Sequence, residues 1–446
     1  MTAALLFQLV SLVASVAMVP LLLRFVGAEE YLLWAVFTTI GGLTLQLEAA
    51  IQTLMVRRVA LRFAAADLAG LRAEEGRARG AFLRLSLLVF VVVIPGGWLY
   101  MQHVASGTGS AVAWPPAWLA FGFAYGLNYL FGPNNVLLLG TARTDSFYRI
   151  GTLSRILNIS LAFAALWAGF GLLGMSAAFL LSVVVNTVSI SIIAARVRRG
   201  AGEGYDSGPA GGPALAGRAA LIAEDAGLGR YTFFTLSAYL LYRGAFLLIV
   251  GSLDAPDAAA YGLALQAFAI LGSIAVIPLH IRLHVLAKAL HDGDYATETQ
   301  ELVRAVGFAV LAMAGGLAAV VLVGPPVLAL ISSNVGLPPL TTLALMAAAF
   351  LVEALIMVFA NLLILRRDLG FVTGYALLVL AGLGVGVPLL ATGVPVGVAM
   401  LAVPLIVQAT LSLPLVVGRL ARRRGEGTGG LLKTMARAAP AAVRWA

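Results

Sequence analysis

The chain consists largely of apolar segments of about 20 residues, the length that an α-helix needs to cross the hydrocarbon core of a bilayer. Hydrophobic residues make up 61% of its 446 residues and charged residues only 11%, whereas a typical soluble domain carries about 25% charged residues. Such a composition argues against a soluble globular enzyme and against a disordered chain. We therefore predict an all-α polytopic membrane protein.

Twelve segments have the length and hydropathy of membrane-spanning helices. They cover residues 4–23, 31–54, 81–102, 114–140, 151–170, 172–195, 231–251, 261–282, 303–323, 340–365, 371–392 and 394–418. The fifth and sixth meet between Gly169 and Gly174 with almost no connection; a single long helix is the alternative, but it is too long for one crossing. Pro133 interrupts the fourth segment and predicts a kink, because proline removes a backbone donor.

The basic residues predict the orientation of these helices. All but two of the 29 lysines and arginines fall in alternate connections or in the C-terminal segment. Arg143, Arg149 and Arg155 are assigned to one such connection. Because basic loops stay in the cytoplasm, both termini are predicted to be cytoplasmic. The two exceptions, Arg24 and Arg243, lie in or beside apolar segments and are candidates for function.

The chain divides into two halves. Residues 198–230 are rich in Gly, Pro and Ala and predict a flexible cytoplasmic linker. The linker separates an N-terminal six-helix bundle, 1–197, from a C-terminal six-helix bundle, 231–418, which is followed by a basic cytoplasmic tail, 419–446.

The halves also repeat a short pattern. Val26-Gly27 is followed by acids and Tyr31 at the start of the second span, and Val250-Gly251 is followed by acids and Tyr261 at the start of the eighth. A repeat of equal orientation predicts two bundles with a pseudo-twofold axis along the membrane normal, with a substrate path between them and alternating access.

Residues 24–60 carry a family resemblance. An arginine closes the first helix (Arg24), a glycine turn leads to Tyr31, and an acid, Glu48, precedes the arginines of the first basic connection. This pattern resembles the lipid-linked oligosaccharide flippases of the multidrug/oligosaccharidyl-lipid/polysaccharide exporter superfamily. Glu48 stands in place of the usual Asp, and Ala50 in place of the usual Gly. The turn from Val250 to Tyr261 is similar to the turn before the family's eighth helix.

The resemblance implies a function. A flippase of this kind moves undecaprenyl-diphosphate-linked oligosaccharide across the bacterial inner membrane, by alternating access, for O-antigen, lipopolysaccharide or other surface polysaccharide. Its implied partners are the lipid-linked oligosaccharide, membrane lipids and the polysaccharide polymerase or other assembly proteins; no nucleic acid is expected.

Polar residues within the spans are the candidate substrate ligands. Arg243 and Arg24 suit a diphosphate because a guanidinium forms bidentate, charge-assisted hydrogen bonds. Tyr239 and Tyr242 lie at helical spacing beside Arg243 and suit stacking on sugar rings, or simple helix packing. Two alternatives stay open: an ion pair of Arg243 with Glu48 or Glu353, and an Arg24 side chain that reaches the outer interface.

Further polar residues lie at helix breaks and within two spans. Asn134 and Asn135 follow the break at Pro133, where freed carbonyl groups must face protein or a watery cavity. Glu48 and Glu353 are acids within spans. Each is a candidate for coupling transport to a proton gradient, or for hydrogen bonding between helices.

Several classes of chemistry are not expected. The chain has no Cys and four His without metal-ligand spacing, and it has no Gly-rich phosphate loop. We therefore expect no cofactor, no metal and no enzymatic activity. Two alternatives to the flippase are a multidrug or small-cation antiporter of the same fold, and a membrane scaffold or enzyme of envelope polysaccharide assembly.

Overall fold

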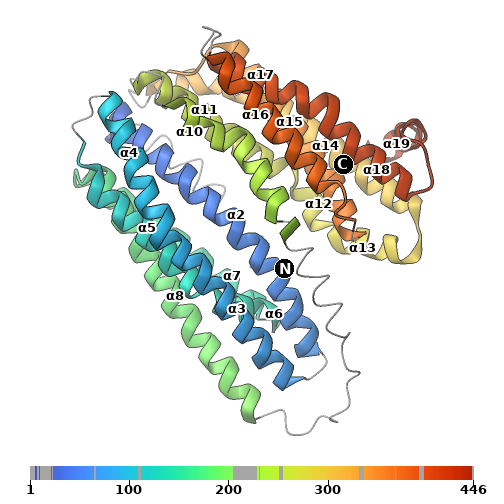
Figure 1. Cartoon of the computed structure of the whole chain (residues 1–446), viewed down its shortest axis with the longest axis horizontal. Coiled ribbons are helices and arrows are strands. Elements are labelled where there is room, and N and C mark those ends of the chain that lie inside the picture. Colours follow the sequence, from blue (N-terminus) through green and yellow to red (C-terminus); the bar gives the residue numbers. More distant parts are fainter. Residues whose placement is uncertain are drawn as a thin grey trace. The chain divides into compact units, whose positions relative to one another are not determined.

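The computed structural model describes most of the chain beyond its first helix. The described ranges are 24–64, 67–108, 112–141, 143–203, 232–250, 255–330, 336–366, 368–390 and 396–443, with Leu6, Phe7, Val10, Leu22, Gly229 and Arg230. All regular structure in these ranges is helical (Figure 1), which confirms the all-α prediction.

Contacts separate the chain into two compact units. The N-terminal unit comprises Met1–Thr235, Val250–Ala259 and Ile331–Val335. The C-terminal unit comprises Leu236–Ile249, Ala260–Leu330 and Gly336–Ala446.

Eight helices in the described ranges are long and apolar enough to cross a membrane. They are Ala28–Ala60, Leu68–Ser106, Thr144–Trp167, Gly171–Arg199, Pro256–Leu279, Tyr295–Leu330, Leu340–Leu365 and Leu401–Arg423. Four predicted spans are not among them. Segment 4–23 lies almost entirely outside the described residues, 114–140 is broken into two helices, 231–251 is described only in part, and 371–392 has a shorter apolar stretch, Val372–Gly386.

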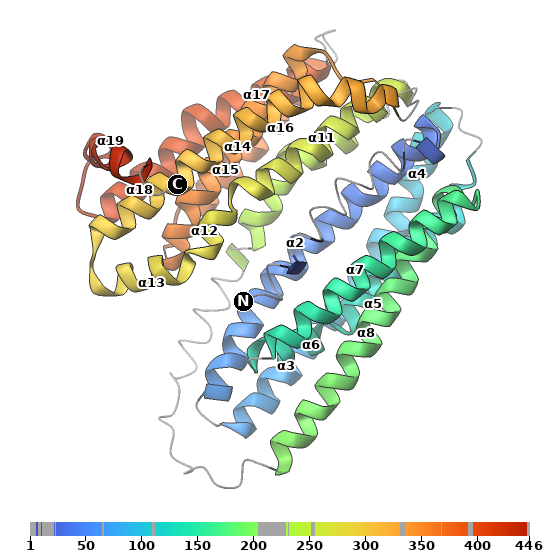
Figure 2. The same ribbon diagram turned by 180° about the vertical axis from the view of Figure 1, so that it is seen from behind.

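Long helices build the N-terminal unit. They are α2 (Ala28–Ala64), α3 (Leu68–Leu88), α4 (Ile94–Thr108), α5 (Trp114–Leu130), α6 (Gly132–Gly140), α7 (Thr144–Trp167) and α8 (Gly171–Glu203). A π-helical turn, Val89–Val93, joins α3 to α4. Figure 2 shows α8 running beside α5 and α7, with which it makes its most extensive contacts, while α2 packs against α3 and α6.

Glycines permit the tight turn between α7 and α8 and the break between α5 and α6. Gly169 and Gly171 adopt positive φ angles of 81° and 50° in the turn between α7 and α8, a conformation that costs other residues steric strain. This turn confirms two helices in place of one long one. Gly132 begins α6 next to Pro133, and a Cβ atom there would lie 2.2 Å from the ring of Phe82. The break predicted near Pro133 is therefore present.

The first basic connection is largely helical. Residues 55–80 lie between the predicted spans 31–54 and 81–102, and there α2 continues to Ala64 and α3 begins at Leu68. Pairs at i,i+3 and i,i+4 spacing, Glu74–Arg77 at 2.6 Å and Glu75–Arg79 at 2.8 Å, stabilise this charged helical turn.

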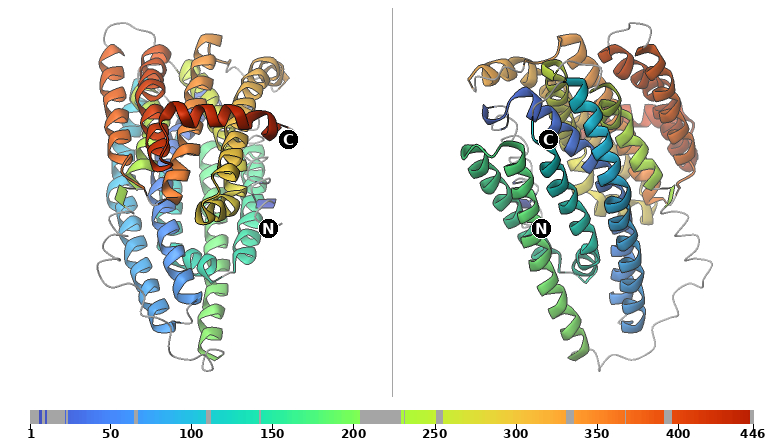
Figure 3. Two further views of the ribbon diagram at one scale, coloured as in Figure 1. Left: turned by 90° about the vertical axis from the view of Figure 1, so that its right-hand side faces the viewer. Right: turned by 60° about the vertical axis from the view of Figure 1, so that its left-hand side comes forward.

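The C-terminal unit contains both long and short helices. They are α10 (Ala245–Ile249), α11 (Ala255–Ala275), whose first turn belongs to the N-terminal unit, α12 (Ile277–Ile281), α13 (Leu283–Asp292), α14 (Tyr295–Leu330), α15 (Leu340–Leu365), α16 (Val372–Leu390), α17 (Val396–Val407), α18 (Leu413–Arg423) and α19 (Thr428–Val443). π-Helical turns cover Leu240–Gly244 and Gln408–Ser412. The segment predicted as a tail is largely helical: α19 lies crosswise to the longer helices and packs on α14 (Figure 3).

Helices α3 and α14 begin with the same arrangement of charges. Asp67 precedes α3 and accepts a hydrogen bond from the Gly70 N–H at 2.8 Å; Asp294 precedes α14 and accepts one from the Thr297 N–H at 3.0 Å. Seven residues after each aspartate stands a buried glutamate, and three residues further an arginine that pairs with it. These pairs are Glu74–Arg77 at 2.6 Å and Glu301–Arg304 at 2.7 Å.

A second arginine approaches each of these glutamates from the preceding part of the same unit. Arg58 lies 3.9 Å from Glu74, and Arg282 lies 3.6 Å from Glu301. The capping hydrogen bonds hold the pKa values of both aspartates below their usual range; the bond from the Gly70 N–H is the main cause for Asp67, and the Thr297 hydroxyl is the main cause for Asp294. The two halves thus share a structural repeat that extends beyond the acidic turns noted in the sequence.

Candidate functional site

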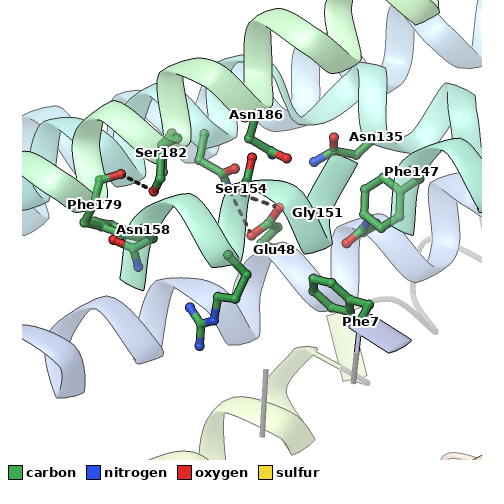
Figure 4. Close-up of a pocket in the computed structure, with 14 residues that line it drawn as sticks. Phe7, Glu48, Asn135, Phe147, Gly151, Ser154, Asn158, Phe179, Ser182 and Asn186 are labelled. Atoms are coloured by element: carbon green, nitrogen blue, oxygen red, sulfur yellow. Dashed lines mark hydrogen bonds between the residues drawn. The ribbon is translucent and has the colours of Figure 1, made fainter. Parts of the chain in front are cut away.

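The N-terminal unit contains an open cavity of about 240 Å³, lined by polar and aromatic residues, between its apolar helices. Its walls come from α2, α5, α6, α7 and α8, with Phe7 at one side (Figure 4). The lining residues are Phe7, Glu48, Gln52, Asn128, Asn135, Phe147, Gly151, Ser154, Arg155, Asn158, Phe179, Ser182, Val183 and Asn186.

Helical spacing brings these polar side chains to one space. On α7, Ser154, Arg155 and Asn158 lie three, four and seven residues after Gly151, which places the four residues along one side of the helix. On α8, Ser182, Val183 and Asn186 likewise lie three, four and seven residues after Phe179. Polar residues in a membrane helix are expensive unless they face protein or water, so this convergence marks a site.

Two opposite charges line this cavity. The Glu48 side chain is buried, and the Asn128 amide donates to each of its carboxylate oxygens at 3.4 Å. Arg155 enters from α7. Within the described ranges, neither Glu48 nor Arg155 forms an ion pair with another residue or with each other.

Three atoms in the cavity wall are buried without a hydrogen-bond partner among the described residues. They are Ser154 Oγ, Arg155 Nε and Asn186 Oδ1. An unsatisfied buried polar atom costs about 1–3 kcal/mol. A bound molecule or water that supplies these missing partners would recover that free energy.

The two predicted asparagines occupy different environments. Asn135 lines the cavity. Asn134 instead donates to Ser191 Oγ at 2.9 Å and accepts from Arg198 at 2.6 Å, and Arg198 also pairs with Glu75. Asn134 thus ties α6 to the charged end of α8.

The predicted arginines also differ in their surroundings. Arg24 is exposed, with its guanidinium 5.9 Å from the ring of Phe25, and it does not line the cavity. Arg243 lies in the π-helical turn Leu240–Gly244 of the C-terminal unit, 5.2 Å above the ring of Tyr239. Tyr242 belongs to the same turn, and its side chain lies outside the described part.

Arg243 has an acid of opposite charge in its own unit. No ion pair within 4 Å joins the two among the described residues, but Glu353 on α15 is near enough for an electrostatic interaction with the guanidinium. Of the partners that the sequence left open for Arg243, the structure therefore places Glu353 beside it, and Glu48 lies in the other unit.

Arg155 is the main cavity residue that the sequence reading missed. The positive-inside count placed it in a basic connection, but α7 begins at Thr144, eleven residues earlier. At 1.5 Å per residue, Arg155 lies about 16 Å along the helix. The spacing of Ser154, Arg155 and Asn158 was the available signal. In the described residues, no group of His, Cys, Asp and Glu could hold a metal ion.

No model of a known protein family matches the chain, and no curated protein matches its sequence. Solved structures do resemble it. An inward-facing multidrug resistance MATE family transporter of the MOP superfamily has a TM-score of 0.62 and 12% identity, covering 98% of this chain and 96% of its own. The MATE multidrug transporter DinF-BH, solved as a complex, has a TM-score of 0.58 and 15% identity, covering 95% of both chains.

A third similar structure is a MOP superfamily transporter from Pyrococcus furiosus, described by the reverse polarity of its binding pocket. Its TM-score is 0.51 and its identity 14%, with 98% of this chain and 95% of its own covered. Since these similarities extend over nearly the whole length, the chain is a multi-pass membrane protein with the fold of the MATE transporters of the MOP superfamily.

Proposed function

We propose that the chain is a multidrug-type antiporter that exports amphipathic organic molecules in exchange for protons. The observation that carries this proposal is Glu48, a buried acid in a polar cavity of a transporter fold. The sequence has no nucleotide-binding loop, so an ion gradient is the proposed source of energy.

Exchange follows from the chemistry of a single carboxylate. Glu48 binds either a proton or a positively charged or hydrogen-bond-donating group of the substrate, and occupancy by one opposes occupancy by the other. The weak hydrogen bonds from Asn128, at 3.4 Å, leave the carboxylate accessible to both.

Expression in an efflux-deficient bacterium tests this function. Cells that express the protein are expected to accumulate several-fold less rhodamine 6G than cells with an empty vector, and Glu48→Gln is expected to restore full accumulation. Glu29→Gln is the matched control, because Glu29 stands on the same helix and does not line the cavity. Equal accumulation with the wild-type protein present in the membrane would contradict the proposal.

A second candidate function is translocation of undecaprenyl-diphosphate-linked oligosaccharide across the bacterial inner membrane. The observation in its favour is that two guanidinium groups, Arg155 and Arg243, stand within helices of apolar character. A deletion strain separates the two candidates: accumulation of lipid-linked sugar on the inner leaflet supports the flippase, and increased drug sensitivity with normal surface polysaccharide supports the antiporter.

A further inference from the structure

The cavity of the N-terminal unit holds charges that its own described residues do not neutralise. Glu48 enters from α2 and Arg155 from α7, and each lacks an ion-pair partner among those residues. A charged side chain within the membrane is costly unless it faces a partner, protein or water. Opposite charges that share a cavity without pairing are suited to a ligand that carries both signs.

The atoms without partners differ in chemistry. Arg155 Nε is a donor, which suits an anionic group, and Ser154 Oγ can donate or accept. Asn186 Oδ1 is an acceptor without a partner, and Glu48 is an acid, so together they suit an amine or another donor.

The size and apolar lining restrict what fits. About 240 Å³ is just below the range of about 300–1,000 Å³ typical of drug sites. The aromatic rings of Phe7, Phe147 and Phe179 contribute the apolar surface. This space accommodates a ring or a compact headgroup with its charged substituents, while the rest of a larger molecule stays outside.

We propose that Arg155 binds the anionic group of an amphoteric ligand and that Glu48 binds its amine or other donor. This inference rests on the proposed function, because it names the substrate class of the same cavity. An aromatic amino acid-like solute and a phosphatidylethanolamine headgroup both carry this chemistry, and the experiment below distinguishes them.

Two dyes of the same skeleton test the anionic end. Rhodamine 6G is an ethyl ester, and rhodamine 19 is the corresponding free acid, so the second differs by one carboxylate. Fluorescence anisotropy with the purified full-length protein is expected to show at least tenfold tighter binding of rhodamine 19, since a charge-assisted hydrogen bond contributes about 1.5–3 kcal/mol.

Substitution of Arg155 removes the proposed contact. For Arg155→Gln, the affinities for rhodamine 6G and rhodamine 19 are expected to differ by no more than about twofold. Arg155→Lys is expected to keep part of the wild-type preference for rhodamine 19. Arg149→Gln is the matched control, because Arg149 is exposed on the same helix and does not line the cavity. Retained binding of rhodamine 6G shows that a variant is folded; should Arg155→Gln not fold, Arg155→Lys supplies the comparison.

Competition with dihexanoyl-phosphatidylethanolamine identifies the source of the ligand. Displacement of rhodamine 19 that depends on Arg155 indicates a lipid headgroup, and a dye preference without displacement indicates a free solute. Equal affinity of the wild type for both dyes, or a preference unchanged in Arg155→Gln and Arg155→Lys, overturns the proposal. Export of rhodamine 6G by cells is measured separately, so failure of transport with an intact dye preference refutes the proposed function alone.

Discussion

The two units agree where α3 and α14 begin and differ in the middle of their apolar helices. In both, a capping aspartate is followed by a buried glutamate held between two arginines. In the middle of the helices, Glu48 of the N-terminal unit faces a cavity with only an amide as its partner, whereas Glu353 of the C-terminal unit has Arg243 nearby. The units therefore agree where the repeat fixes helix ends and differ at the acids within the helices, where we propose that a ligand binds in the N-terminal unit.

The difference predicts separate roles for the two acids. A carboxylate without a countercharge exchanges ligands freely, whereas a carboxylate near a guanidinium is compensated by it, so that removing either group leaves the other charge uncompensated. The predictions below, in order of decreasing effect, test this contrast.

The largest effect is expected on export. Glu48→Gln should reduce rhodamine 6G efflux at least tenfold, because a glutamine neither releases a proton nor pairs with a cation. Glu353→Gln should keep at least half of the wild-type rate per molecule of folded protein. Efflux from preloaded cells measures both, and equal losses in the two variants would remove the distinction between the units.

The next effect is on stability. Arg243→Gln or Glu353→Gln alone leaves the other, half-buried charge without its countercharge and should lower the free energy of unfolding by about 1 kcal/mol. The double variant should be more stable than either single variant. Thermal unfolding of the wild type, both single variants and the double variant in detergent gives a double-mutant cycle. If the loss of stability in the double variant equalled the sum of the two single losses, the two charges would not be coupled.

A smaller, pH-dependent effect is expected at Asp368, which lies between α15 and α16. Burial opposes its ionisation, but hydrogen bonds from Arg419, Arg423 and the Gly370 N–H outweigh burial and lower the pKa of Asp368 to about 2. Because this pKa is below the unfolded value of about 4, the stabilisation is complete above pH 4 and is lost as the pH falls through 2.

Asp368→Asn should therefore unfold at a lower temperature than the wild type at pH 7. The difference should persist to about pH 4 and shrink below it. A difference that stays constant from pH 7 to pH 2 would mean that the ion pairs of Asp368 with Arg419 and Arg423 do not contribute.

Much of the fold was predictable from the sequence because apolar length and helix breakers act locally. The positions of the long helices, the turn at Gly169–Gly171 and the break before Pro133 all follow from such signals. Helix ends were less predictable. By hydropathy the third span begins at residue 81, yet α3 begins at Leu68 and intrahelical ion pairs stabilise its charged first turns.

The site was only partly predictable because it depends on contacts between distant segments. Glu48 and Asn135 were chosen from the sequence and do line one cavity. Arg155 was counted as a topological charge, since hydropathy does not show where α7 begins. The acid that pairs with Arg198, Glu75, and the acid near Arg243, Glu353, both lie on helices far away in the sequence.

Proton-driven uptake into proteoliposomes tests the central claim most directly. With an acidic lumen, the wild-type protein should accumulate rhodamine 6G several-fold above the level reached without a pH gradient. Glu48→Gln should reconstitute in the same amount as the wild type yet show no accumulation in response to the gradient. Accumulation by Glu48→Gln to the wild-type level would contradict the assignment of proton exchange to the N-terminal cavity.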